Sequence, residues 1–109
     1  AERFARAGHA VVGFARDPGK SAGLSERWAG EGLRVEIRAA DAGDFDRLRA
    51  AIAEAERASG PADTLVYNAY RASFAQPSAL RPEDAVADFR VNVAGALAAY
   101  ERAAAIDPT

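Results

Sequence analysis

Residues 10–20 read Ala-Val-Val-Gly-Phe-Ala-Arg-Asp-Pro-Gly-Lys, an unbroken apolar run that ends in a polar loop. Such a run is typical of a strand buried on both faces of a parallel sheet. Residues 33–38 alternate between apolar and polar side chains, which predicts a half-buried second strand. Residues 62–67 contain Thr-Leu-Val-Tyr, which predicts a third, buried strand.

Apolar residues at spacings of three and four predict helices around these strands. The expected helices span 1–7, 22–29, 44–58 and 82–105. Helices that alternate with strands are typical of βαβ crossovers and of a parallel sheet covered on both faces. We therefore expect part of a three-layer, doubly wound Rossmann-type α/β fold, with residues 1–109 belonging to a single domain.

The composition narrows the classes of protein that remain. A net charge of −2 argues against a nucleic-acid surface. No apolar run is long enough for a membrane span, and no segment has the pattern of a secretory leader, so we expect a cytoplasmic protein without nucleic-acid or membrane partners. The absence of Cys and the single His exclude thiolate and multi-histidine metal sites, so no metal is expected.

The first residues of the sequence and its amino-acid composition lead to two further expectations. The first residue is Ala1, and the sequence opens inside a helical pattern without a capping residue. We expect a first strand and a glycine-rich phosphate-binding turn upstream of it. The abundance of Arg and Ala favours a bacterial source with a GC-rich genome.

Ligands of such sheets bind beyond the carboxyl ends of the strands, which directs attention to the residues that follow each strand. Arg16 follows the first strand, where NAD-binding folds carry an acid and NADP-binding folds carry an arginine for the 2′-phosphate. Lys20 would add charge nearby, and a solvated loop arginine is the alternative for Arg16. Asp41 follows the second strand and could accept a hydrogen bond from adenine, or simply act as a turn residue.

Two further positions stand out in the second half of the sequence. Asn68 and Ala69 follow the third predicted strand. Asn92 lies in the middle of the last predicted helix, where its amide competes with the backbone for hydrogen bonds. A solvent-facing Asn with no function is the alternative there.

Taken in order, these segments resemble the classical short-chain dehydrogenases/reductases. The resemblance is carried by Asp41, by Leu-Val-Tyr-Asn-Ala at 65–69 and by Val-Asn-Val-Ala-Gly at 91–95, at the spacing that the family has. It implies that Arg16 selects NADP over NAD and that Asp41 binds adenine. It also implies that Asn68 and Ala69 line the cofactor ribose, and that Asn92 is the catalytic-tetrad Asn, which orders a water leading to the active-site lysine.

The sequence also departs from the family pattern. Tyr67 replaces the first Asn of the family's Asn-Asn-Ala-Gly motif, and Tyr70 replaces its Gly. The catalytic Ser and the Tyr-x-x-x-Lys segment are missing, since Lys20 is the only lysine. Residues 106–109 do not resemble the family's next strand, so we expect these catalytic residues outside the sequence or a break near residue 105.

The resemblance implies an NADP-dependent oxidoreductase that transfers hydride between NADP(H) and a small carbonyl or alcohol substrate. The substrate itself is not specified, because the pocket is built by later segments of the family. A non-catalytic Rossmann-like binding or regulatory module is the alternative, since fold does not imply activity. A flavodoxin-like or receiver-like sheet is a third reading.

Oligomerisation is also expected from the last predicted helix. It carries small residues on a second side, namely Ala85, Ala96, Ala99 and Ala103. The resemblance implies a homodimer or homotetramer in which this helix packs against its symmetry mate. Alternatively, the same side lies on the protein's own sheet.

Overall fold

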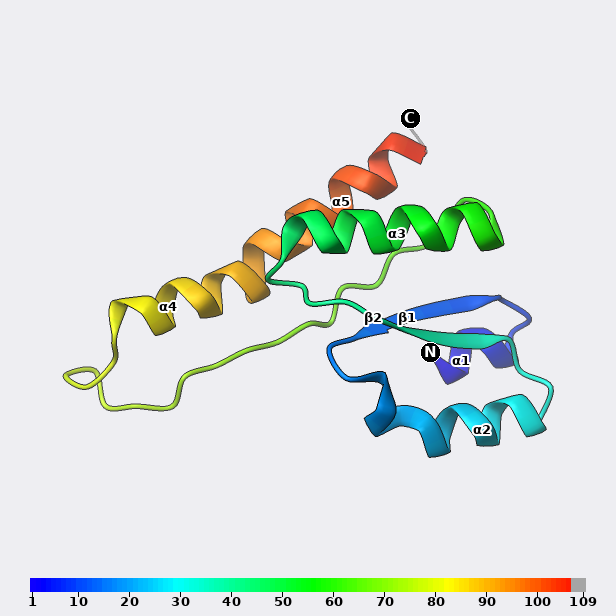
Figure 1. The fold of residues 1–109 in the computed structure, drawn as a ribbon, viewed down its shortest axis with the longest axis horizontal. Helices are drawn as coiled ribbons and strands as arrows, with labels where there is room; N and C mark the ends of the chain where they lie inside the picture. The colour runs from blue at the N-terminus through cyan, green and yellow to red at the C-terminus, as the bar shows by residue number, and fades with distance from the viewer. Residues whose placement is uncertain (107–109) are drawn as a thin grey trace. The chain divides into compact units, whose positions relative to one another are not determined.

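The computed structural model describes residues 1–106, with side chains described through Arg102. The chain forms two compact units, an N-terminal unit of Ala1–Asp41 and a C-terminal unit of Ala42–Thr109. The elements are, in order (Figure 1), α1 (Glu2–Arg6), β1 (Val11–Ala15), a short 3₁₀ turn (Pro18–Ser21), α2 (Ala22–Gly30), β2 (Val35–Ala39), α3 (Phe45–Ser59), α4 (Pro82–Phe89), a π-helical turn (Arg90–Ala94) and α5 (Gly95–Ile106).

The N-terminal unit is a β-α-β arrangement. β1 and β2 pair in parallel, with Val11 opposite Val35 and Ala15 opposite Ala39, and α2 packs against β2. Trp28 on α2 is among the residues that form its small core. The two strands predicted at 10–15 and 33–38 are therefore confirmed, with small shifts at their ends, although β1 is half-buried along its length and not buried on both faces.

The ends of α1 and α2 share one capping geometry. Gly8 follows α1 with a φ of 97°, and the N–H of His9 donates to the carbonyl of Phe4 at 3.1 Å. Gly32 follows α2 in the same way, with a φ of 76°. Only glycine adopts this left-handed conformation freely. The rings of Phe4 and His9 meet edge to face, so His9 belongs to this helix end.

The C-terminal unit is built on helices. Asp44 caps α3, because its carboxylate accepts a hydrogen bond from the N–H of Arg47 at 3.3 Å. α3 packs against α5, and the buried apolar side chains described on these two helices include Leu48, Ala55, Ala98 and Ala99. α4, the π turn and α5 follow each other without a break over the predicted helix 82–105.

The strand predicted at 62–67 is wrong: this segment has no regular secondary structure, and Leu65 and Val66 are exposed. In the common doubly wound sheet, the fourth strand along the chain pairs with the first, which precedes the first helix. Within the described residues no strand precedes α1. Among the described residues no strand pairs with this segment, so the backbone hydrogen-bond ladder that a strand requires does not form there.

The helical region 82–106 does not bury the side that carries its large apolar residues. Its apolar stripe stays exposed in this structure, at Val86, Phe89, Val93, Leu97 and Tyr100. Of the small residues predicted to face a symmetry mate, Ala99 is buried in the unit that packs α5 on α3, whereas Ala85 is exposed and Ala96 half-buried. The side chain of Ala103 lies outside the described residues. Ala99 is therefore covered within the chain itself.

Candidate functional site

Arg16 and Asp41 lie just beyond the carboxyl ends of the two parallel strands. Ala15 and Ala39 are the last paired residues, and the N–H of Ala40 donates to the carbonyl of Ala15 at 3.0 Å, which continues the pairing by one residue. Arg16 comes directly after β1, and Asp41 comes two residues after β2; both are exposed. The parallel register thus brings these two predicted site residues to the carboxyl edge of the strand pair.

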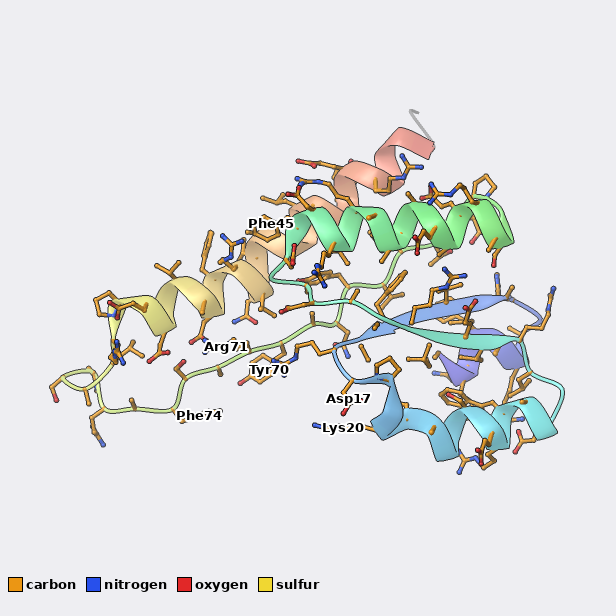
Figure 2. All side chains as sticks on the ribbon, in the orientation of Figure 1. Asp17, Lys20, Phe45, Tyr70, Arg71 and Phe74 are labelled. Atoms are coloured by element: carbon orange, nitrogen blue, oxygen red, sulfur yellow. The ribbon has the colours of Figure 1, made fainter. Side chains whose placement is uncertain are left out.

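The loop after β1 leaves Arg16 as a cation without a carboxylate partner. The neighbouring acid, Asp17, caps the 3₁₀ turn, and its carboxylate accepts from the N–H of Gly19 at 3.0 Å. Arg16 forms no ion pair among the described residues. Lys20 stands at the end of the same turn, and Figure 2 shows Asp17 and Lys20 both on this loop. The loop is therefore suited to bind an anion.

Asn68 and Ala69 lie exposed on the extended segment between α3 and α4. Asn92 lies in the π turn, and its amide grips the backbone of Arg71. Asn92 Oδ1 accepts from the N–H of Arg71 at 2.8 Å, and Asn92 Nδ2 donates to the carbonyl of Arg71 at 2.7 Å. The structure therefore ties the predicted catalytic Asn92 to the same segment as Asn68 and Ala69.

A second helical side chain holds this segment two residues further on. Asp88 Oδ2 accepts from the N–H of Ser73 at 3.0 Å, and Asp88 Oδ1 accepts from the Ser73 hydroxyl at 3.2 Å. The guanidinium of Arg71 pairs with Asp88 and donates to the carbonyl of Asp84 at 3.2 Å. We call Arg71, Ser73, Asp88 and Asn92 the side-chain clamp. Figure 2 shows Arg71 between the extended segment and α4.

The two tyrosines that replace motif residues behave differently. The hydroxyl of Tyr67 donates to the carbonyl of Val91 in the π turn. It also lies against Gly95, where an added Cβ would clash with this hydroxyl and with the carbonyl of Ala42. Tyr70, by contrast, is 71% exposed. Tyr67 therefore braces the helix near Asn92, and Tyr70 is free to meet a ligand.

The predicted site residues thus fall into two groups. Arg16 and Asp41 belong to the N-terminal unit, and Asn68, Ala69 and Asn92 belong to the C-terminal unit. The sequence interpretation missed Arg71 and Asp88. Their signal was the spacing of Asp84, Asp88 and Asn92, which places a polar side chain at every fourth position of one helix.

In residues 1–106, no three acidic or histidine side chains gather closely enough to hold a metal ion. No helix in that range combines the length and apolar character that crossing a bilayer requires.

The paired β1-α2-β2 unit and the polar residues at its carboxyl edge define a partial Rossmann-type α/β fold. The chain belongs to the short chain dehydrogenase family, whose sequence model matches residues 1–106. No curated protein matches the chain.

Solved structures share this fold. A gluconate 5-dehydrogenase from Burkholderia cenocepacia, in complex with NADP and tartrate, is 34% identical with a TM-score of 0.83; the match covers 96% of this chain and 41% of that one. A metagenomic short-chain oxidoreductase in complex with NADP is 26% identical with a TM-score of 0.91, over 97% of this chain and 48% of that one. A short-chain dehydrogenase/reductase from Serratia marcescens is 26% identical with a TM-score of 0.88, over 96% and 43% respectively. The chain thus spans less than half the length of these proteins.

Proposed function

We propose that the chain is the adenosine side of an NADP-dependent short-chain oxidoreductase, which transfers hydride between NADP(H) and a small carbonyl or alcohol. On this proposal both units belong to one NAD(P)-binding domain. The observation that carries it is Arg16, an exposed cation at the carboxyl end of β1 with Ala15 in place of an acid.

The chemistry of the β1 loop fits the 2′-phosphate that distinguishes NADP from NAD. A phosphate ester needs charged donors, and the guanidinium of Arg16 offers a planar fork of them. The neighbouring carboxylate of Asp17 is engaged at the 3₁₀ turn, where it accepts from the N–H of Gly19. NAD would instead call for a carboxylate toward the free ribose hydroxyl, and Ala15 cannot supply one.

For the other predicted site residues we propose the roles that the resemblance to the family implies. Asp41 accepts from the adenine amino group, and Asn68 and Ala69 line the ribose nearer the nicotinamide. Asn92 is the tetrad Asn; its amide keeps one hydrogen and one oxygen lone pair for a water, since the Arg71 backbone takes one of each. NADP supplies the hydride chemistry when bound, and these residues supply orientation and charge.

The relatives support the cofactor more than the substrate. Two of them were solved with NADP, and one of these is named as a gluconate 5-dehydrogenase. We extend from them only the class of substrate, a small carbonyl or alcohol compound. We also propose a cytoplasmic, homo-oligomeric bacterial enzyme, in keeping with the composition and with the family.

A non-catalytic nucleotide-binding module remains the second candidate. The observation that favours it is the pair Tyr67 and Tyr70 in place of the family's motif Asn and Gly. The sequence of the full gene decides between the two: a Ser followed by Tyr-x-x-x-Lys beyond Thr109 supports the enzyme, and a gene that encodes neither supports the module.

Titration of the full-length protein with NADPH and with NADH tests the proposal. We expect tighter binding of NADPH, and we expect Arg16→Ala to weaken NADPH by roughly tenfold or more while leaving NADH nearly unchanged, because a charge-assisted hydrogen bond is lost. Arg27→Ala, which removes an exposed arginine from α2, is the matched control. Tighter binding of NADH by the unaltered protein, or equal weakening of both cofactors by Arg16→Ala, would refute the role of Arg16.

A further inference from the structure

Side chains of α4 and of the π turn hold the extended segment after α3 by hydrogen bonds to its backbone. In a sheet, the backbone of a neighbouring strand would make such bonds. The amide of Asn92 forms hydrogen bonds with the N–H and the carbonyl of Arg71, and the carboxylate of Asp88 accepts a hydrogen bond from the N–H of Ser73. The pairing runs antiparallel, because the later helical residue meets the earlier residue of the segment. Figure 1 shows the segment running along α4.

The two spacings match for a geometric reason. Residues 71 and 73 lie two apart on an extended chain, which advances by about 6.6 Å. Asp88 and Asn92 lie four apart on a helix, which advances by about 6 Å. Side chains at every fourth helical position can therefore meet every second residue of an extended segment. A slip of the segment by one residue would turn these backbone groups away and break every bond at once.

The ion pair of Arg71 with Asp88 joins the two ends of this arrangement and is partly withdrawn from water. Their side chains are 37% and 20% exposed, whereas Arg81 and Glu83, an ion pair at the start of α4, are 74% and 72% exposed. Less water around a charge pair strengthens it and makes its geometry matter more. Asp88 also accepts from Ser73, so one carboxylate connects Arg71 to Ser73.

We propose that Arg71 and Asp88 are positioning residues that set the register of the extended segment on the helix, and thereby the placement of Asn68 and Ala69 toward the cofactor. Asn68 lies only three residues before Arg71. An extended chain gripped at residues 71 and 73 has little freedom to shift along its own direction at residue 68. The cofactor part of this inference rests on the proposed function; the register part does not.

Amide hydrogen exchange on the full-length protein tests the register directly. The amides of Arg71 and Ser73 should be protected, and Asp88→Ala should lower the protection of both by roughly tenfold or more, although Asn92 is unaltered. Asp88→Asn keeps one acceptor for Ser73 and should give an intermediate loss; it also serves if Asp88→Ala does not fold. Arg81→Ala is the matched control and should change neither amide. Wild-type protection of the Arg71 amide in both Asp88 variants would overturn the register.

NADPH titration and steady-state kinetics of the same proteins test the placement. Arg71→Ala and Asp88→Asn should raise the Kd and KM for NADPH by about tenfold, while the KM for the second substrate moves much less, because misplaced binding groups weaken what they contact. A structural role alone would lower the melting temperature without this split. Unchanged NADPH affinity with lost amide protection would overturn the positioning claim. Failure of the unaltered protein to bind NADPH or NADH would instead overturn the proposed function, and the exchange result would still decide the register.

Discussion

The N-terminal unit and the segment 62–74 begin from the same kind of sequence and end as different structures. Val11–Ala15 is a short apolar run that pairs with Val35–Ala39 through backbone hydrogen bonds. Residues 62–67 also contain a short stretch typical of a strand, Thr-Leu-Val-Tyr, yet they form no strand. The segment that continues from them is held by Asp88 and Asn92 instead. The comparison teaches that an apolar run becomes a strand only where a neighbouring backbone accepts it.

The largest effect should come from adding a side chain at Gly95, where the structure has no room for one. A Cβ there would press into the carbonyl of Ala42 and the hydroxyl of Tyr67. We expect Gly95→Ala to lower the free energy of unfolding by about 3 kcal/mol, because overpacking against backbone forces the helix away. Urea unfolding measures it. Gly23→Ala, at a helical site with open space, should be neutral or slightly stabilising; equal stability of the two variants would contradict the contact.

The second largest effect should come from removing the amide of Asn92, which makes two hydrogen bonds within the side-chain clamp. Asn92→Ala takes away both hydrogen bonds to the Arg71 backbone, at a site that water reaches, so we expect a loss of about 1 kcal/mol. Unfolding by denaturant and exchange of the Arg71 amide measure it. Asn68→Ala removes an exposed Asn on the same segment and should cost less; if both variants lose the same stability, the grip of Asn92 on the segment is not what holds it.

Tyr67→Phe tests the side chain at the end of residues 62–67, which form no strand. Its hydroxyl donates to the carbonyl of Val91, and the side chain is half-buried. Loss of this hydrogen bond should cost about 1 kcal/mol or slightly less. The matched change Tyr70→Phe, at an exposed side chain, should leave stability unaltered. Thermal unfolding of both variants checks the difference, and a larger loss from Tyr70→Phe would refute it.

The smallest effect concerns the N-terminal unit and acid. Arg6 donates to Glu2 at 2.8 Å, and this hydrogen bond holds the pKa of the Glu2 carboxyl below its ordinary value. A lowered pKa in the folded protein means that the stabilisation is present above the ordinary pKa and disappears as the pH falls through the lowered one. Glu2→Gln should therefore be slightly less stable at neutral pH and no different in strong acid. A difference that persists in acid would contradict this assignment.

Much of the fold could be predicted because its signals are local. Glycine at position 8 ends α1 in a left-handed conformation, and Asp44 caps α3, both as a matter of neighbouring residues. Family membership could be predicted from the order of Asp41, Asn68 and Asn92 along the chain, and the match over residues 1–106 confirms it. The proposed roles of these residues, and that of Arg16, stay predictions.

The sequence by itself determined where helices and the first two strands form, because periodicity and capping act between residues close in the chain. Only the tertiary structure decided that residues 62–67 form no strand, since a strand depends on a second strand that is distant in sequence. The tertiary structure also decided that Asn92, an unusual residue within a helix, forms hydrogen bonds with the backbone of Arg71, and that Arg71 forms an ion pair with Asp88. Such contacts join residues far apart in the chain, and their side-chain spacing becomes meaningful only once the segment lies along the helix.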